Sequence, residues 1–379
     1  MTSAGSQGGV GAATLSTATA APSARRAAKT SLHIPSLDGI RAASFFLVFL
    51  AHAGLEDRVP GGFGVTVFFF LSGYLILTLM RVEFEKTETV SLRAFYLRRV
   101  LRILPPFYLV LTVATALTAA GVIHGALSRA AVAAQFLHFA NYWIVYHGYD
   151  GQAPGTGVYW SLAVEEHFYL FAPWLYLLLA RGRIRPSRQA AIVLALCALV
   201  LAWRCVLVLH FHAPTDRTYL ATDTRVDSIL FGIALALYRN PVLDGPPPGS
   251  PALWKRVLGP VAVAVLLFTF VWRNPAFRET ARYSLQGLAL IPLFTIAIQW
   301  PDLLPCRLLN ARAVAFVGLL SYSLYLLHQV VIVALEQQLP AVNAVLRGTL
   351  ALGLSLAIAY AIYVAIERPC ARLRKRLQA

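Results

Sequence analysis

Long apolar runs recur along most of this chain and constrain its fold more than any other feature. About 20 apolar residues form a helix long enough to cross the hydrocarbon core of a bilayer. Hydrophobic residues make up 58% of the 379 positions and charged residues only 13%, a balance that soluble domains do not carry. The sequence therefore predicts an all-α, polytopic membrane protein with about ten transmembrane helices, near residues 38–56, 62–80, 103–123, 157–180, 189–210, 221–238, 254–273, 282–300, 312–335 and 343–366.

The basic residues predict how these helices are oriented. With ten spans, both termini lie on one side, and that side holds 23 of the 33 Lys and Arg, while the other side holds seven and three lie inside helices. Because positive residues mark cytoplasmic loops, both termini are predicted to be cytoplasmic, with the protein in the inner (plasma) membrane. The net charge of +16 then reflects topology and attraction to anionic lipid, which argues against a nucleic-acid partner.

Two polar tails flank the predicted membrane domain. Residues 1–36 are rich in Ala, Ser, Thr and Gly and lack an apolar run, so they are predicted to be a disordered cytoplasmic tail. Residues 37–367 form the transmembrane domain, and residues 368–379 are predicted to be a basic cytoplasmic tail. The four cysteines have no metal-ligand spacing, so no metal site is predicted.

Two of the predicted helices are long enough to span only if they include ionisable residues. The apolar run 168–180 covers 13 positions, so the fourth helix also takes in Glu165 and Glu166. The sixth helix takes in Arg225 and Asp227 for the same reason. Ionisable residues inside a bilayer are expensive and usually mark a site. An ordinary ion pair between Arg225 and Asp227 at a helix end is the alternative reading.

The first helix carries two ionisable residues on one face. Arg41 and His52 are eleven residues apart, which is close to three turns and about 16 Å along the axis. Counting along each helix places His52 in the outer half of the membrane, together with the two glutamates, Arg225, Asp227 and, in the ninth helix, His328. Such a group of imidazoles, carboxylates and an arginine suits proton transfer inside a membrane. His328 could equally serve as a hydrogen-bonding residue between helices.

A second group of charges lies where the third helix meets the inner interface. Arg99 and Arg102 are three residues apart and therefore share a face. Two guanidinium groups at that spacing suit phosphate recognition. Basic residues at this position are also ordinary interfacial anchors, so the prediction depends on the site further along the membrane.

Several motifs in their shared order resemble the acyltransferase 3 family of integral membrane O-acyltransferases. The resemblance covers about residues 35–370 and rests on Leu37–Ala42 with the Arg41-to-His52 spacing, Gly64–Ile76, Arg99 with Arg102, Tyr159–Leu170, Ser321–His328 and Glu367–Pro369. Two positions depart from the family pattern. Thr66 stands where many relatives have an acidic residue, and His167 follows the paired glutamates where Gln is common.

The resemblance implies transfer of an acyl group, often acetyl, from acyl-CoA to a hydroxyl, commonly of a carbohydrate. By analogy His52 is the catalytic histidine, Arg41 its motif partner, and Arg99 with Arg102 hold the donor. Acyl-CoA is then a co-substrate, and no permanently bound cofactor is expected. We expect Glu165 or Glu166 to orient His52. The supporting polar cluster predicted around these residues comprises Asp38, Arg225, Asp227, Tyr322 and His328.

Two rival functions stay open at this stage. Polar residues at one depth are also how transporters and flippases build their sites, although the sequence shows no two-fold repeat of hydropathy. Within the enzymes, the acceptor could be a small secondary metabolite such as a macrolide. The sequence also leaves open whether the acyl group passes directly to the acceptor or first to His52.

Overall fold

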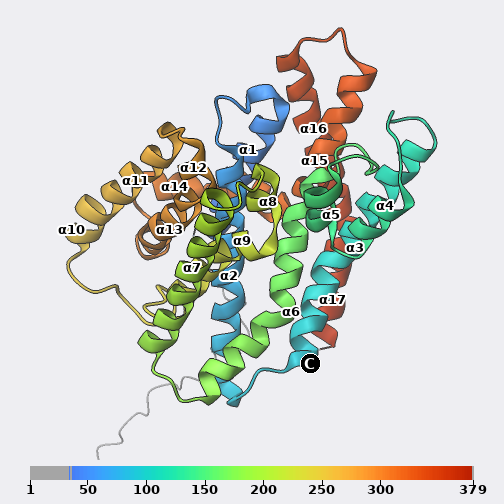
Figure 1. Cartoon of the computed structure of the whole chain (residues 1–379). Coiled ribbons are helices and arrows are strands. Elements are labelled where there is room, and N and C mark those ends of the chain that lie inside the picture. The colour runs from blue at the N-terminus through green and yellow to red at the C-terminus, as the bar shows by residue number, and fades with distance from the viewer. Residues whose placement is uncertain (1–33, 35, 378–379) are drawn as a thin grey trace, which may run out of the picture. The chain divides into compact units, whose positions relative to one another are not determined.

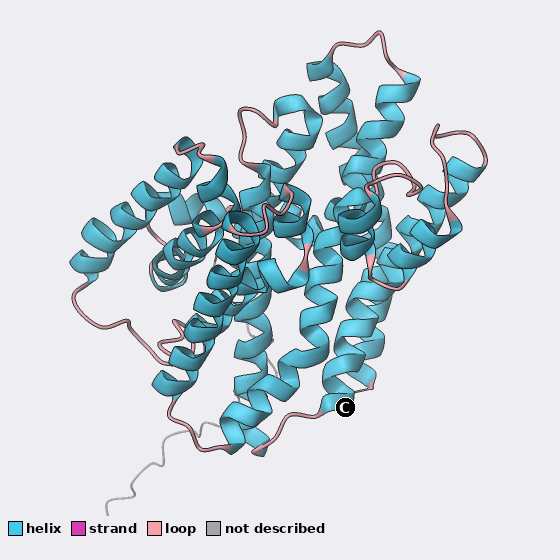
Figure 2. Cartoon of the chain, viewed as in Figure 1, coloured by secondary structure: helices cyan, strands magenta, loops and turns pink. Residues whose placement is uncertain are grey.

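The computed structural model describes residue 34 and residues 36–377, and every regular element in them is a helix (Figure 2). The predicted tail 1–36 therefore lies almost entirely outside the described residues, as do residues 378–379 of the C-terminal tail. The first half of the chain forms α1 (Leu37–Leu50), η2 (Ala51–Leu55), α2 (Gly61–Thr87), α3 (Leu92–Ala119), α4 (Arg129–Phe136), α5 (Ala140–His147), η3 (Gly157–Tyr159), α6 (Trp160–Arg181) and α7 (Pro186–Leu209). The second half forms α8 (Thr215–Leu220), α9 (Thr222–Leu237), α10 (Pro251–Leu253), η4 (Trp254–Leu258), α11 (Gly259–Val271), α12 (Pro275–Glu279), α13 (Ala281–Gln299), α14 (Leu304–Leu309), α15 (Arg312–Gln338), α16 (Ala344–Ile362), η5 (Tyr363–Glu367) and α17 (Arg368–Arg376).

Each of the ten predicted apolar windows coincides with a helix, and eight of the helices in the described residues are long and apolar enough to cross a membrane. The chain is therefore a multi-pass membrane protein. The two predicted spans that do not meet this measure are α6 and α9, which are the two that the sequence extends only by including ionisable residues. The count of ten and the cytoplasmic termini stay predictions.

Helix α9 is short and almost completely buried among other helices. It has 16 residues, and thirteen of them, Thr224 through Leu237 except Val226, are buried. It packs against α2, α7 and α13, while α2 in turn packs against α1 (Figure 1). A helix that is covered by protein on all sides tolerates polar residues that lipid would not, because neighbouring helices satisfy them.

Close packing against α14, through Leu309, and against α15, through Gly318, fixes the position of the first helix. A Cβ atom on Gly39 would lie 2.0 Å from the backbone oxygen of Leu309, and one on Gly318 would lie 1.8 Å from that of Asp38. Small residues at such crossings let helix backbones approach closely inside a membrane. Ser36 strengthens the contact, since its backbone N–H donates to Asn310 Oδ1 over 2.8 Å. The register between α1 and α15 places His52 beside His328.

Candidate active site

His52 lies where the first helix loses its regular α-helical geometry. The segment η2 has π-helical hydrogen bonding, and the backbone leaves helical angles at Ala53 and at Gly54, where φ is +94°. A side chain at Gly54 would meet no neighbouring atom within 4 Å, so the glycine is needed for its backbone conformation and not for space. Single π-helical turns occur often at functional sites. This irregular turn holds His52 beside α15.

The partner of His52 is His328. Nδ1 of His52 lies 2.9 Å from Nε2 of His328, and the two rings stack with their centroids 5.2 Å apart. His328 is fully buried, and its Nδ1 lies 2.8 Å from the backbone oxygen of Tyr325 and 3.2 Å from that of Leu324. A carbonyl oxygen can only accept, so Nδ1 of His328 donates and a neutral His328 accepts at Nε2. This hydrogen-bond network assigns the proton of neutral His52 to Nδ1 and leaves the lone pair on its Nε2.

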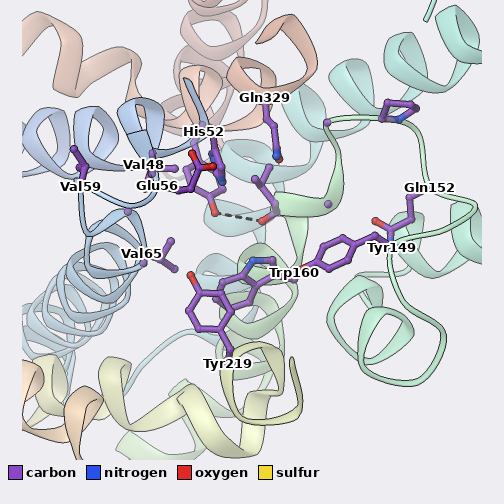
Figure 3. Close-up of a pocket in the computed structure, with 18 of the residues that line it drawn as sticks. Val48, His52, Glu56, Val59, Val65, Tyr149, Gln152, Trp160, Tyr219 and Gln329 are labelled. Carbon is purple, nitrogen blue, oxygen red and sulfur yellow. Dashed lines mark hydrogen bonds between the residues drawn. The ribbon is translucent and has the colours of Figure 1, made fainter. Parts of the chain in front are cut away.

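His52 borders a cavity of about 440 Å³, which we call the histidine cavity. His52 and Glu56 lie on one side of it, and the aromatic rings of Trp160 and Tyr219 lie across from them (Figure 3). Tyr149 and Gln329 also line it. Among the described residues no hydrogen bond occupies Nε2 of His52. The volume falls within the range of sites for small ligands.

A second group of charged side chains, which we call the arginine cluster, comprises Arg41, Arg99, Arg102, Glu165 and Glu166. Glu165 lies in the electrostatic field of the guanidinium groups of Arg102, Arg99 and Arg41. Arg99 packs near the rings of Phe95 and Tyr169, at 5.9 and 5.8 Å, and its buried Nε atom has no partner in the described residues. Arg99 and Arg102 form no salt bridge in the described residues, which makes this region attractive to an anion.

The structure places the two glutamates with the arginines and not with His52. Glu165 accepts a hydrogen bond from the hydroxyl of Tyr169 over 2.8 Å, and no hydrogen bond in the described residues joins either glutamate to His52. The carboxylate that borders the same cavity as His52 is Glu56. The predicted single group at one depth is therefore divided in two, and His328 takes the orienting position that we expected of a glutamate. The physical reason is rotation about the axis of α6, which turns the two glutamates toward Arg99 of α3.

The alternative reading of Arg225 and Asp227 as an ion pair is wrong. Asp227 is paired with Arg204 of α7, whose guanidinium donates to the carboxylate over 2.7 Å, and both side chains are fully buried. Arg204 also donates to the backbone oxygens of Thr280 and Thr224. Since residues two apart on a helix point to different sides, Arg225 and Asp227 face different neighbours. The Arg204–Asp227 pair ties α7, α9 and α13 together.

Arg225 lies in an aromatic cage. It is fully buried, and its guanidinium lies 4.0 Å from the ring centroid of Tyr283 and 5.1 Å from that of Tyr219, with Phe69 and Trp160 somewhat further away. One of its terminal nitrogens donates to Thr66 Oγ1 over 3.1 Å. Arg225 is therefore bonded to a neutral hydroxyl at position 66, where the family pattern leads us to expect an acidic residue.

The remaining predicted residues have structural partners. Asp38 forms an ion pair with Arg41 one turn along α1. Tyr322 donates to the backbone oxygen of Ile103 over 2.7 Å and lies near both glutamates. His167 makes a 2.8 Å hydrogen bond through Nδ1 to Thr222 Oγ1, which joins α6 to the start of α9. In the described part of the chain, no three His, Cys, Asp or Glu side chains are arranged to hold a metal ion.

The sequence did not single out several residues that line the histidine cavity. Trp160 lies inside a motif that supports the resemblance, and Gln329 directly follows His328, so position along the chain could have suggested both. Glu56 lies one turn after His52 and could have been found in the same way. Tyr149 and Tyr219 come from segments without a recognisable pattern, and only the fold brings them to the cavity.

Comparison with known proteins identifies the family of this chain. The family model described as an acyltransferase domain, Acyl_transf_3, matches residues 34–364. The chain belongs to the acyltransferase 3 family. The peptidoglycan O-acetyltransferase OatA of Listeria monocytogenes is 28% identical over 313 residues, which are 79% of this chain and 49% of that protein. The O-acetyltransferase OatA of Staphylococcus aureus is 30% identical over 315 residues, which are 79% of this chain and 51% of that protein.

The chain spans about half the length of these curated relatives. No solved structure matches it. The matched segment 34–364 contains His52, His328 and all residues of the arginine cluster, but it stops before Glu367 and α17.

Proposed function

We propose that this protein is a membrane O-acyltransferase that moves an acyl group from acyl-CoA to a hydroxyl of a carbohydrate in a surface or exported glycan. We expect the acyl group to be acetyl. The observation that carries the proposal is the contact of His52 with His328 at the edge of the histidine cavity, which leaves the lone pair of His52 Nε2 for chemistry. A neutral imidazole is a competent base near pH 7. The two OatA relatives are O-acetyltransferases, which supports the choice of a hydroxyl acceptor.

In the proposed reaction, Nε2 of His52 takes the proton of the acceptor hydroxyl as its oxygen attacks the thioester carbonyl. The new C–O bond forms, the C–S bond breaks, and the CoA thiolate leaves with the proton returned by Nε2–H. Nδ1–H of His52 donates to His328 throughout, which holds the ring in place and spreads the charge of the imidazolium. Base catalysis of this kind contributes roughly 10²–10⁴-fold to the rate.

The arginine cluster is the proposed binding site for the phosphates of the donor. Arg99 and Arg102 present guanidinium groups that suit phosphate oxygens, and Arg41 lies beside them on the same helix as His52. Helix α1 and the η2 turn that continues it connect the two sites. Arg41 and His52 are about 16 Å apart along this span. Acyl-CoA bound at the arginines would extend along α1 toward His52. Glu165 and Glu166 then balance the charge of the arginines when the donor is absent.

The aromatic wall of the histidine cavity is the proposed binding surface for the acceptor. Trp160 and Tyr219 offer flat apolar faces with polar edges, on which the CH-rich face of a sugar ring packs well. With this function we also propose the predicted topology: ten spans in the plasma membrane, residues 37–367 as the acyltransferase 3 transmembrane domain, and both flanking tails, residues 1–36 and 368–379, in the cytoplasm.

Transfer of labelled acetyl groups from acetyl-CoA in membranes that contain the protein tests the proposal. We expect incorporation of label into the carbohydrate fraction with the native protein and none above background with His52→Ala. Full activity of His52→Ala would refute the catalytic role of His52. Movement of a glycan across the membrane without consumption of acetyl-CoA would instead support a transporter.

A further inference from the structure

A second cavity adjoins the histidine cavity. It has a volume of about 670 Å³, and its walls share Glu56, Val59, Gly61, Gly62 and Tyr219 with the histidine cavity. A molecule larger than one sugar unit could therefore occupy both cavities at once. The chemistry of the second cavity limits which part of an acceptor it would hold.

The charged lining of this cavity has one more arginine than carboxylates. Arg58, Arg273, Arg278 and Arg282 border it, against the carboxylates of Glu56, Asp57 and Glu279. Glu279 lies 3.9 Å from Arg282 and also accepts a hydrogen bond from Thr218, so that carboxylate already has partners. In the described residues Arg58, Arg273 and Arg278 form no salt bridge, and the buried Nε of Arg282 has no partner.

Arg225 adds a further positive charge directly behind the cavity wall. Its guanidinium lies against the rings of Tyr219 and Tyr283, which both line the cavity. In the described residues its hydrogen bonds go to neutral oxygens, Thr66 Oγ1 and the backbone oxygen of Tyr219, and its buried Nε has no partner. No carboxylate in the described residues lies within salt-bridge distance. A buried cation without a counter-ion projects its field further than a paired one, because little solvent screens it.

We propose that the second cavity binds an anionic group of the acceptor, so that the preferred acceptor is an acidic carbohydrate. Its carboxylate or phosphate would lie among the arginines of the second cavity, while a hydroxyl on the same or the next sugar reaches His52. Planar guanidinium groups match both anions through paired N–H donors. This inference rests on the proposed function, because it names the substrate class of the same site.

Binding of matched disaccharides to the purified full chain in detergent tests the inference without relying on catalysis. The probes are cellobiouronic acid, cellobiose 6-phosphate and neutral cellobiose. We expect the native protein to bind at least one acidic probe about tenfold more tightly than cellobiose, as a charge-assisted contact at a partly exposed site provides. The two acidic probes show whether carboxylate or phosphate is preferred.

The double variant Arg273→Gln with Arg278→Gln should bind the acidic and neutral probes equally. These side chains are at the exposed rim, so the fold should tolerate the change, and unaltered binding of cellobiose verifies this. Arg129→Gln is the matched control, because Arg129 is exposed and lines neither cavity; it should keep the preference. Equal binding of all probes by the native protein, or a preference that survives in the double variant, would overturn the inference and leave these arginines as interfacial anchors.

The test also separates this inference from the proposed function. A protein that prefers acidic probes but transfers no acetyl group would retain the anion site and refute the function. Transfer to acidic and neutral acceptors with equal efficiency would keep the function and refute the anion site.

Discussion

The histidine cavity and the arginine cluster each take a side chain from the first span, His52 from η2 and Arg41 from α1, yet their side chains are held in different ways. His52 has one partner, His328, and that partner is itself fixed by backbone oxygens of α15. The arginines lie among one another and near two glutamates, and the buried Nε of Arg99 and Oε1 of Glu166 have no partner in the described residues. A directed hydrogen bond fixes a proton on one atom, whereas charged groups without a fixed partner can still form hydrogen bonds to a ligand.

This difference suggests separate functions for the two regions. The histidine cavity has the order that a chemical step requires, since a small displacement of a base costs much of its effect. In the described residues Arg99 and Arg102 of the arginine cluster form no salt bridge, so their guanidinium groups are available to bind an anion. Changes in the first region should therefore lower kcat, and changes in the second should raise the KM for the donor.

Replacement of His328 should have the largest effect among the partners of His52. His328→Ala removes the acceptor of Nδ1–H, so His52 is free to adopt the other tautomer or another orientation. We expect kcat to fall roughly 10²-fold with little change in the KM of donor or acceptor. His328→Gln keeps an acceptor oxygen and should recover roughly tenfold of the loss.

Steady-state kinetics across pH 6 to 9 would test the function of His328. A purely structural role predicts that both variants lose folded protein in proportion to activity, with an unchanged pH profile for the remainder. A positioning role predicts normal protein amounts, a low kcat and a profile that differs between the Ala and Gln variants.

Arg99→Gln and Arg102→Gln should raise the KM for acyl-CoA by roughly 10–100-fold together, because each removes a charge-assisted contact to phosphate. The kcat at saturating donor should change little. Arg98→Gln is the matched control, since Arg98 is on the same helix but is paired with Glu83 over 2.7 Å. A rise in KM for the control as large as for the other two would mean that general positive charge, and not these two positions, attracts the donor.

The sequence predicts the elements of this fold well because the bilayer imposes a simple length rule. All ten apolar windows are helices. This includes α6 and α9, whose windows reach spanning length only when their ionisable residues are counted. The pairing of His52 with His328 was not predicted, because depth along a helix does not determine rotation about its axis. Depth alone placed Glu165 beside His52, whereas the rotation of α6 turns it toward the arginines.

Arg204 shows the other limit of the sequence. An arginine in the middle of α7 has no recognisable partner in the sequence, since Asp227 and Ser284, both bonded to it, are 23 and 80 residues away. The sequence offered Arg225 as the obvious partner of Asp227 because the two are close in the chain. Proximity in sequence was misleading here, since the two side chains leave α9 in different directions.

Thr66→Asp should have a smaller effect, on the preference of the second cavity for acidic disaccharides. The carboxylate would lie beside Arg225, whose nitrogen is 3.1 Å from Thr66 Oγ1, and would cancel the unpaired charge behind the second cavity. We expect the preference for the acidic disaccharides to fall by roughly threefold, while binding of cellobiose stays the same. Thr66→Asn, which has the same size without the charge, serves as the control. An unchanged preference in Thr66→Asp would show that Arg225 has no influence on the second cavity.

Glu165→Gln should have the smallest effect on the chemical step and tests the division between the two regions most directly. Gln keeps an oxygen that accepts the hydrogen bond from Tyr169 but removes a negative charge from the arginine cluster. With more net positive charge near the donor phosphates, the KM for acyl-CoA should fall by about twofold to fivefold, and kcat should stay within about threefold. If Glu165 instead oriented His52, kcat would fall by roughly 10²-fold or more and the donor KM would stay the same. Measuring both constants in Glu165→Gln and His328→Ala therefore decides which residue holds the imidazole, because only one of the two variants should lose kcat.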